Sequence, residues 1–295
     1  MLIATFRIGP LRRLSALAIA VLALLVFTLF TPSSDGAPAL SPAAAQGTPL
    51  PVIMYHGLLR DPAMAGPYVL SPDDFEADIL YLQQHGYETV SMQQIIDYVL
   101  HDGPLPEKPV LLTLDDGCLN NLTYLPDILE RTDACALVSV VGQYVSLFTE
   151  RPDPNPSYAY MTWSEIAELA ATGRVEIGNH SWGFHAQSPR RGSTRLQGES
   201  DTQYRDILTS DAQRLQDALT ENCGLTPQVY TYPYGQISAG ADEILCDMGF
   251  TATLSCYELV TTLIPGQPDC LYSIGRYNRP SGIASADFFA GIGLN

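Results

Sequence analysis

Short runs of apolar residues alternate with amphipathic segments from residue 50 to the C-terminus. A short apolar run bounded by turn residues is typical of a buried strand, and apolar residues three or four apart are typical of a helix packed on one face. The pattern predicts strands at 51–56, 89–90, 109–117, 135–142, 175–180, 228–235, 250–255 and 271–278. It predicts helices at 71–86, 91–103, within 121–132, and at 162–173, 201–221, 240–249 and 285–291.

Three of these helices carry their own start signals. A Ser or Thr followed three residues later by an acidic residue or Gln forms a capping box, in which each residue satisfies a backbone N–H of the other. The pairs are Ser71 with Asp74, Ser91 with Gln94, and Thr162 with Glu165.

The alternation of strands and helices favours an α/β fold with a parallel sheet. Seven or eight such units within residues 50–295 suit one closed or nearly closed barrel, a (β/α)7–8 barrel, because a single barrel domain can reach this length. The carboxyl ends of barrel strands converge on one face, and that face carries the chemistry in barrel enzymes. We therefore expect a single catalytic domain over residues 50–295.

The N-terminus has a different character. Three arginines within residues 1–13 precede a run of 17 residues without a charge. Residues 1–30 are thus expected to be either a cleaved signal peptide or an uncleaved membrane anchor, and both alternatives place the rest of the chain outside the cytoplasm. Residues 31–49 are rich in Pro, Ala and Ser, which is typical of a flexible linker.

The excess of acidic over basic residues limits the kinds of molecule that the chain can bind. The chain has a formal net charge of −17, and residues 48–295 contain 12 basic and 31 acidic residues. A nucleic-acid partner is excluded because no basic patch could neutralise phosphates. Six cysteines lie in the part expected to be exported, where disulfides are permitted, but their spacing does not select a pairing.

Chemically versatile side chains recur at or just after the ends of the expected strands. In a barrel these positions meet on one face, so together they indicate an active site, although each alone has an ordinary structural explanation. The residues are His56, Asp115, Asp116, His180, Tyr232, Tyr234 and Arg276.

His180 and His185 are two of only five histidines in the chain. On a regular helix, residues five apart would point roughly 140° away from each other and could not share a metal ion. On a loop that leaves a strand, however, they can turn back toward one point, and Gly183 would help the chain to turn. A carboxylate from another strand would complete a site of two histidines and one carboxylate with positions open to water and substrate.

Five short motifs together resemble the polysaccharide deacetylases of carbohydrate esterase family four, with its NodB homology domain, over most of residues 50–280. "TLDDG" at 113–117 and "HSWGFH" at 180–185 look like the family's two metal motifs. "YPYG" at 232–235 looks like its third motif, and "MYHG" at 54–57 and "GRYNRP" at 275–280 are also similar. The five-residue histidine spacing followed by "SPRRG" resembles a membrane-anchored branch common in Gram-positive bacteria.

The resemblance implies a distorted (β/α) barrel that binds one divalent metal ion, with zinc expected and cobalt, manganese or nickel as alternatives. By position, Asp116, His180 and His185 would hold the metal, and Asp115 would be the general base. A backbone N–H near Tyr234 would stabilise the oxyanion.

Other residues are expected to contact substrate or the oxyanion, namely Pro233, His56 and Arg276. The implied reaction removes N-acetyl groups from a polysaccharide containing N-acetylglucosamine, which could be peptidoglycan, an exopolysaccharide or a chitin-like polymer.

The sequence departs from the family pattern at two places. Thr231 stands where the third motif usually has the arginine that orients the base, and no histidine follows His185 to supply the late-motif general acid. Arg276 and Arg279 lie near the position of that late motif, so one of them is predicted to hold Asp115 or a substrate oxygen. Two alternatives therefore remain: a glycan-binding surface module that has lost turnover, and an O-acetyl esterase, whose leaving group needs less help from an acid.

Overall fold

The computed structural model describes residues 47–295. The expected signal peptide or anchor and nearly all of the expected linker lie outside this range, so they stay predictions. Within residues 47–295, none of the helices combines the length and the apolar character needed to cross a membrane.

A curled parallel sheet forms the centre of the described part of the chain. Its strands follow the order β10-β9-β8-β7-β6-β2-β12, and β5 pairs beside the start of β6. The strands are β2 (Val52–Tyr55), β5 (Glu88–Thr89), β6 (Pro109–Leu114), β7 (Ala136–Val140), β8 (Val175–Asn179), β9 (Val229–Thr231), β10 (Ala252–Leu254) and β12 (Tyr277–Asn278).

The segment that leads into β12 joins the two ends of this sheet. Ile274 forms a parallel bridge with Leu254 of β10, and its N–H donates to the Thr253 carbonyl at 2.9 Å. Three residues later, Tyr277 pairs with Ile53 of β2. The sheet therefore curls into the predicted distorted (β/α) barrel, and a single domain is confirmed for the described residues.

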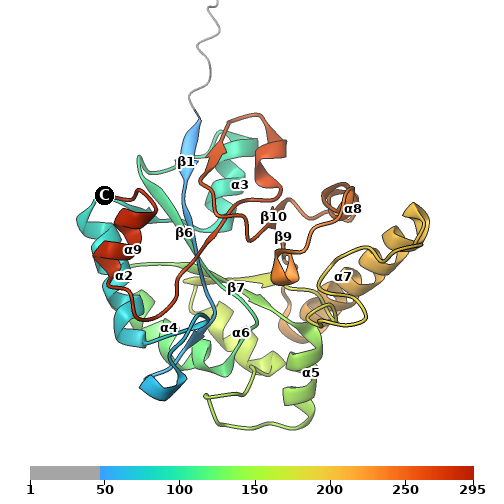
Figure 1. Ribbon diagram of the computed structural model, residues 1–295, viewed down its shortest axis with the longest axis horizontal. Coiled ribbons are helices and arrows are strands. Elements are labelled where there is room, and N and C mark those ends of the chain that lie inside the picture. The colour runs from blue at the N-terminus through green and yellow to red at the C-terminus, as the bar shows by residue number, and fades with distance from the viewer. Residues whose placement is uncertain (1–46) are drawn as a thin grey trace, which may run out of the picture. The chain divides into compact units, whose positions relative to one another are not determined.

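Helices surround the strands in Figure 1, as expected when crossovers cover a parallel sheet. The capping boxes predicted for α3 and α6 are present. At α2, Ser71 accepts from the Asp74 N–H, but the Asp74 carboxylate accepts from the Ser71 hydroxyl and not from its backbone N–H. The helices are α2 (Pro72–Gln84), α3 (Met92–His101), α4 (Leu119–Arg131), α5 (Gly142–Glu150), α6 (Trp163–Ala171), α7 (Asp201–Cys223), α8 (Ala241–Asp247) and α9 (Ser285–Gly291).

Strand β6 shows how the core is divided. All six of its residues are buried, and its aliphatic residues divide between two apolar clusters. Val110, Leu112 and Leu114 pack with residues of the outer helices, whereas Leu111 belongs to a second cluster with residues of β1 and α3. Burying one such leucine contributes about 1.5–3 kcal/mol, so a continuous apolar strand is stable only with both faces covered.

Several smaller elements differ from the sequence prediction. Strand β1 (Thr48–Leu50) pairs antiparallel with β11 (Thr261–Leu263), so the last two residues assigned to the linker belong to a strand. Only the end of the strand expected at 271–278 is regular, and the helix α5 was not predicted. All six cysteines are unpaired. The remaining elements are β3 (Gly57–Leu58), β4 (Val69–Leu70), and the 3-10 turns η1 (Pro62–Met64), η2 (Pro233–Gly235) and η3 (Pro268–Leu271).

Candidate active site

A cavity of about 450 Å³ lies at the carboxyl ends of the barrel strands. This is the face where the sequence placed the chemistry, and the volume is within the usual range for a small-molecule site. Tyr232 and Pro233 do not line this cavity, but the other seven predicted site residues do, namely His56, Asp115, Asp116, His180, His185, Tyr234 and Arg276.

Asp116, His180 and His185 bring one ligand atom each to a common point. His185 Nε2 lies 3.0 Å and His180 Nε2 lies 3.6 Å from Asp116 Oδ1, and the three atoms lie within 4.8 Å of one another. His180 is fixed at the end of β8, whereas His185 returns on the loop that follows. Two imidazoles and one carboxylate are the ligand set of many catalytic zinc and iron sites.

Two details fit this set to a divalent cation. The His180 Nδ1–H donates to the Thr231 carbonyl at 2.8 Å, which leaves Nε2 as a lone pair aimed at Asp116. Asp116 Oδ1 is buried and accepts no hydrogen bond from the described residues. A buried anionic oxygen without a donor is costly, and a cation at this point would remove that cost.

Two tyrosines surround the second histidine. The Tyr144 hydroxyl donates to the His185 carbonyl at 3.1 Å and lies 3.4 Å from its Nδ1. The Tyr234 hydroxyl lies 3.4 Å from the same nitrogen, and its ring packs against the imidazole with centroids 4.6 Å apart. Helix α5 and turn η2 thus hold His185 from two sides.

Asp115 is paired with Arg276. The guanidinium makes two parallel hydrogen bonds to the carboxylate, at 2.7 and 2.9 Å, and both side chains are buried. Arg276 also donates to the Ser255 carbonyl at 2.7 Å and to the Thr113 hydroxyl at 3.2 Å. Because its donors are used within the protein, Arg276 orients Asp115. These hydrogen bonds favour the predicted alternative in which Arg276 holds Asp115, and its assignment to the substrate group stays a prediction.

Burial and neighbouring charges shift the pKa values of Asp115, His180 and His185 in different directions. Burial alone would raise the pKa of Asp115, but the Arg276 guanidinium and the nearby His180 hold it well below the ordinary value. Burial lowers the pKa of His180, which favours the neutral imidazole that a metal ligand requires. Burial would also lower the pKa of His185, but the negative charge of Asp116, whose Oδ1 lies 3.0 Å from Nε2, outweighs this and raises it.

His56 follows β2 and enters the same cavity. Its Nδ1 is buried and has no hydrogen-bond partner among the described residues. The ring meets the exposed ring of Tyr68 edge to face, with centroids 4.8 Å apart. An imidazole with an unpaired nitrogen next to two aspartates is available for proton transfer.

Three other residues singled out in the sequence make contacts that support the fold. Pro233 is buried and begins turn η2, where it precedes Tyr234 without lining the cavity. Thr231 supplies its carbonyl to His180, while its hydroxyl contacts Ser139 at 2.7 Å. Arg279 pairs with Asp78 on α2, so it does not share Asp115 with Arg276.

Sequence analysis missed several residues of the cavity wall. Most come from irregular loops, where no periodicity marks a side chain as facing inward, whereas Met54 and Asn278 lie on β2 and β12. Arg191 lies over the Tyr234 ring at 5.5 Å, and Tyr68 is 60% exposed. The missed lining residues are Met54, Tyr68, Gln187, Arg191, Cys256, Glu258 and Asn278.

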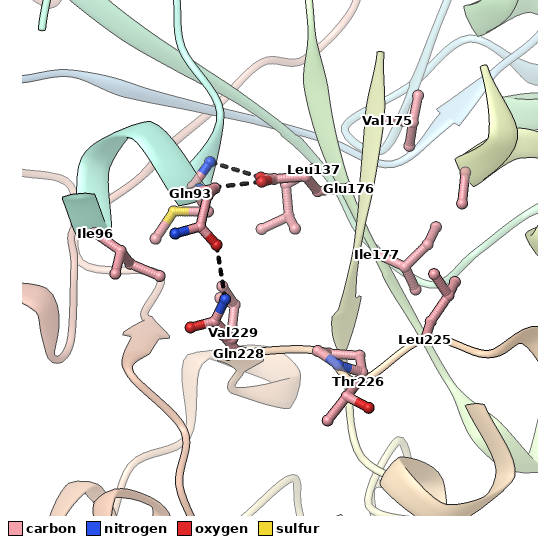
Figure 2. Close-up of a pocket in the computed structure, with 13 residues that line it drawn as sticks. Gln93, Ile96, Leu137, Val175, Glu176, Ile177, Leu225, Thr226, Gln228 and Val229 are labelled. Atoms are coloured by element: carbon pink, nitrogen blue, oxygen red, sulfur yellow. Dashed lines mark hydrogen bonds between the residues drawn. The ribbon is translucent and has the colours of Figure 1, made fainter. Parts of the chain in front are cut away.

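A second cavity, of about 240 Å³, lies at the opposite, amino-terminal ends of the strands. Figure 2 shows that its wall is mainly aliphatic, with Glu176 directed at the start of α3. The Glu176 carboxylate accepts from the N–H groups of Met92 and Gln93 at 2.6 and 3.0 Å, and Gln228 donates to the Gln93 side chain at 2.8 Å. These polar groups are paired with one another, so they stabilise the amino-terminal end of the barrel and are not available to bind or react with a ligand.

The sequence profile of the polysaccharide deacetylase family matches residues 102–253, which is more than half of the chain and includes Asp115, Asp116, His180 and His185. The chain is 29% identical over 189 residues to the poly-β-1,6-N-acetyl-D-glucosamine N-deacetylase of Escherichia coli (strain K12). That match covers 58% of this chain but only 28% of the E. coli protein.

Solved structures agree with the fold. IcaB from Ammonifex degensii superimposes with a TM-score of 0.67 and 26% identity, covering 84% of this chain and 98% of that one. A de-N-acetylase from Aggregatibacter actinomycetemcomitans gives a TM-score of 0.68 with 23% identity, covering 82% and 99% of the two chains. The Gram-positive branch suggested by the histidine spacing stays a prediction. With the matched motifs placed at one cavity of a curled (β/α) barrel, the chain belongs to the polysaccharide deacetylase family of hydrolases.

Proposed function

We propose that this protein is an extracytoplasmic, metal-dependent hydrolase that removes N-acetyl groups from a polymer of N-acetylglucosamine. The observation that supports it best is the placement of Asp116, His180 and His185 next to the Asp115–Arg276 pair in one cavity. Hydrolysis of an amide needs two things: side chains that bind a cation, and a carboxylate positioned to take a proton.

Asp116, His180 and His185 would hold the cation, for which zinc is our first choice because its ligands are nitrogen and oxygen atoms in a site with open positions. When bound, such an ion would polarise the acetamide carbonyl and lower the pKa of a water molecule, so that even a weakly basic carboxylate could remove its proton.

Asp115 would take the proton from the attacking water. Arg276 keeps the carboxylate ionised at neutral pH and fixes its direction through two hydrogen bonds. Asp115 and Asp116 are adjacent in sequence, but Asp116 has a φ of 75°. The backbone therefore turns sharply between them, so that one carboxylate faces the histidines and the other faces Arg276.

His56 would donate the proton that the leaving amine requires. No histidine follows His185, and His56 is the imidazole of the cavity that does not belong to the proposed metal site. The predicted oxyanion donor, the N–H of Tyr234, belongs to a residue with a φ of 56° on turn η2 at the same cavity.

Among the possible glycans we favour poly-β-1,6-N-acetylglucosamine, the polymer named for the E. coli relative. The strongly acidic composition of residues 48–295 suits a product that becomes cationic as acetyl groups are removed. Location outside the cytoplasm rests on the charged and apolar pattern of residues 1–30.

Acetate release by the purified full chain tests the proposal. We would compare poly-β-1,6-N-acetylglucosamine, chitin oligomers and peptidoglycan, first with metal-stripped protein and then with zinc, cobalt, manganese or nickel restored. Asp115→Asn is the test variant. Asp217→Asn, an exposed aspartate on α7, is the matched control.

Release that requires metal and is lost in Asp115→Asn supports a deacetylase with Asp115 as its base. If the protein binds metal and glycan but releases no acetate, the glycan-binding module is correct instead. Faster release from an O-acetylated than from an N-acetylated polymer would identify an esterase.

A further inference from the structure

Three residues, Ser181, Trp182 and Gly183, form most of the turn that brings His185 back toward His180. Their backbone groups are anchored by other parts of the barrel. The Ser181 N–H donates to the Asn179 side chain at 2.9 Å. The Ser181 and Trp182 carbonyls accept from the N–H groups of Gly142 and Gln143, at 3.1 and 2.9 Å.

Helix α5 therefore supports the turn from one side. Its first two residues would otherwise leave N–H groups unpaired, since its N-cap, Val141, has no side-chain acceptor. The turn supplies the acceptors instead. Gly142 allows this close approach, because a Cβ atom at that position would overlap the ring of Trp182.

Asp211 supports the turn from the other side. It lies on α7, between Leu208 and Leu215 on the buried face of the helix. One carboxylate oxygen accepts from the Trp182 N–H and the other from the Gly183 N–H, both at 2.8 Å. The carboxylate thus fixes two consecutive peptide groups midway between the two histidines. Arg214, one turn further along α7, stacks over the Trp182 ring at 4.0 Å.

We propose that Asp211 is a positioning residue that holds the turn of residues 181–183 in the shape that places His185 next to His180. The inference rests on the metal site of the proposed function and assigns a residue outside the ligand set to its affinity. Asp211 makes its hydrogen bonds to the backbone of Trp182 and Gly183 and none to either histidine, so its influence passes through that backbone.

The expected effect follows from this geometry. In Asp211→Asn the side chain keeps its size, but its amide N–H₂ faces one of the two backbone N–H groups and cannot accept from it. One end of the turn is released, and His185 no longer has a fixed position relative to His180. Loss of an outer partner of this kind typically weakens metal binding 10- to 100-fold.

The test measures zinc affinity of the metal-free full chain by titration against a competing chelator. Asp211→Asn and Asp211→Ala are the test variants. Asp217→Asn is an exposed aspartate on the same helix, and Leu219→Val removes a methylene group from a buried position on that helix, away from the turn. Thermal unfolding of each metal-free variant separates a loss of stability from a loss of affinity.

We expect Asp211→Asn to bind zinc at least 10-fold more weakly than wild type, while Asp217→Asn and Leu219→Val keep the wild-type affinity even where the melting temperature of Leu219→Val falls. Equal zinc affinity of wild type and Asp211→Asn would overturn the inference and leave the proposed function standing. An equal loss of affinity in Leu219→Val would also overturn it, because general destabilisation would then explain the result. Wild-type protein that binds no metal would overturn both proposals.

Discussion

Three residues at the candidate site have left-handed backbone conformations that non-glycine residues rarely adopt. Asp116, Ser181 and Tyr234 have φ values of 75°, 69° and 56°. Each such residue costs on the order of 1–3 kcal/mol, a cost that persists where the surrounding structure holds the chain in place. Asp116 is a proposed metal ligand, Ser181 follows the proposed ligand His180, and Tyr234 is the predicted oxyanion donor. The strained backbone therefore occurs where the orientation of a proposed functional group depends on it.

At the same scale, two residues compensate for the departures from the family motifs. The Thr231 side chain makes no hydrogen bond to Asp115, and Arg276 orients that carboxylate from the segment that leads into β12. His56 supplies an unpaired imidazole where no late histidine exists. A motif in the sequence shows which side chain is missing at a given position. It does not show that a residue distant in sequence lies at the same place in the fold.

His56→Ala should discriminate between two kinds of substrate. An amine leaves poorly without a proton, whereas an alcohol leaves an ester more easily, so the loss of a general acid should lower kcat about 100- to 10,000-fold on the N-acetylated polymer and less on an O-acetylated one. Paired rate measurements on both polymers check this, with His101→Ala, an exposed position at the end of α3, as control. Equal losses on the two polymers would show that His56 is not the proton donor.

At the scale of elements, the sequence predicted most helices and strands because local signals specified them. Ser91 and Thr162 cap α3 and α6 as expected, and the apolar run ending at Asp115 is β6. Helix α5 was missed because its cap is not in its own sequence: acceptors on the turn of residues 181–183 satisfy its first N–H groups.

The same reasoning explains what was missed at the site. Asp211 belongs to a helix that was predicted correctly, at a position on its apolar face, yet nothing local says which backbone groups its carboxylate meets. Asp116 and His180 could be predicted because each lies just after a strand, and His185 because it follows His180 closely on the same loop. Their supporting residues come from tertiary contacts, which local patterns do not encode.

Asp211 also predicts how stability responds to pH. Burial raises its pKa to about 6, although the N–H groups of Gly183 and Trp182 and the nearby Arg214 and Arg190 lower it. Since the folded pKa lies above the value of an unfolded aspartate, the protonated form is favoured by folding. The contribution of Asp211 to stability is therefore complete below pH 4 and declines as the pH rises toward 6.

The measurement is the free energy of unfolding of metal-free wild type and Asp211→Asn between pH 4 and 7.5. Relative to the variant, wild type should lose roughly 2.5 kcal/mol over this range, since one pKa unit corresponds to about 1.4 kcal/mol. A difference that stays constant with pH would contradict the raised pKa of Asp211.

At the scale of the whole molecule, two buried ion pairs connect distant parts of the chain. Arg276 reaches Asp115, and Arg279 reaches Asp78 on α2 through hydrogen bonds of 2.8 and 3.0 Å. Asp78 also accepts from the Tyr55 hydroxyl at 3.2 Å. The first pair serves the site, whereas the second anchors the segment between β12 and α9 against the barrel.

Asp78→Asn should destabilise the protein without changing its chemistry. The change leaves the Arg279 guanidinium, which is 2% exposed, without its counter-charge, and breaking a buried pair in this way costs about 3–5 kcal/mol. Asp73→Asn is the matched control on the same helix, because Asp73 has only an exposed contact with Arg60 at 3.6 Å. Chemical denaturation measures the free energy of unfolding of both variants. Similar small decreases in the two would show that the Asp78–Arg279 pair contributes little to stability.

The arginine that orients Asp115 lies 161 positions further along the chain. A growing polypeptide therefore contains its proposed metal ligands long before it contains Arg276. If such a chain buried Asp115 without Arg276, the carboxylate would lack its counter-charge and would favour the neutral, protonated form, which cannot accept a proton. A chain that stops short of the segment leading into β12 would thus hold its proposed metal ligands without the charge that keeps its proposed general base ionised.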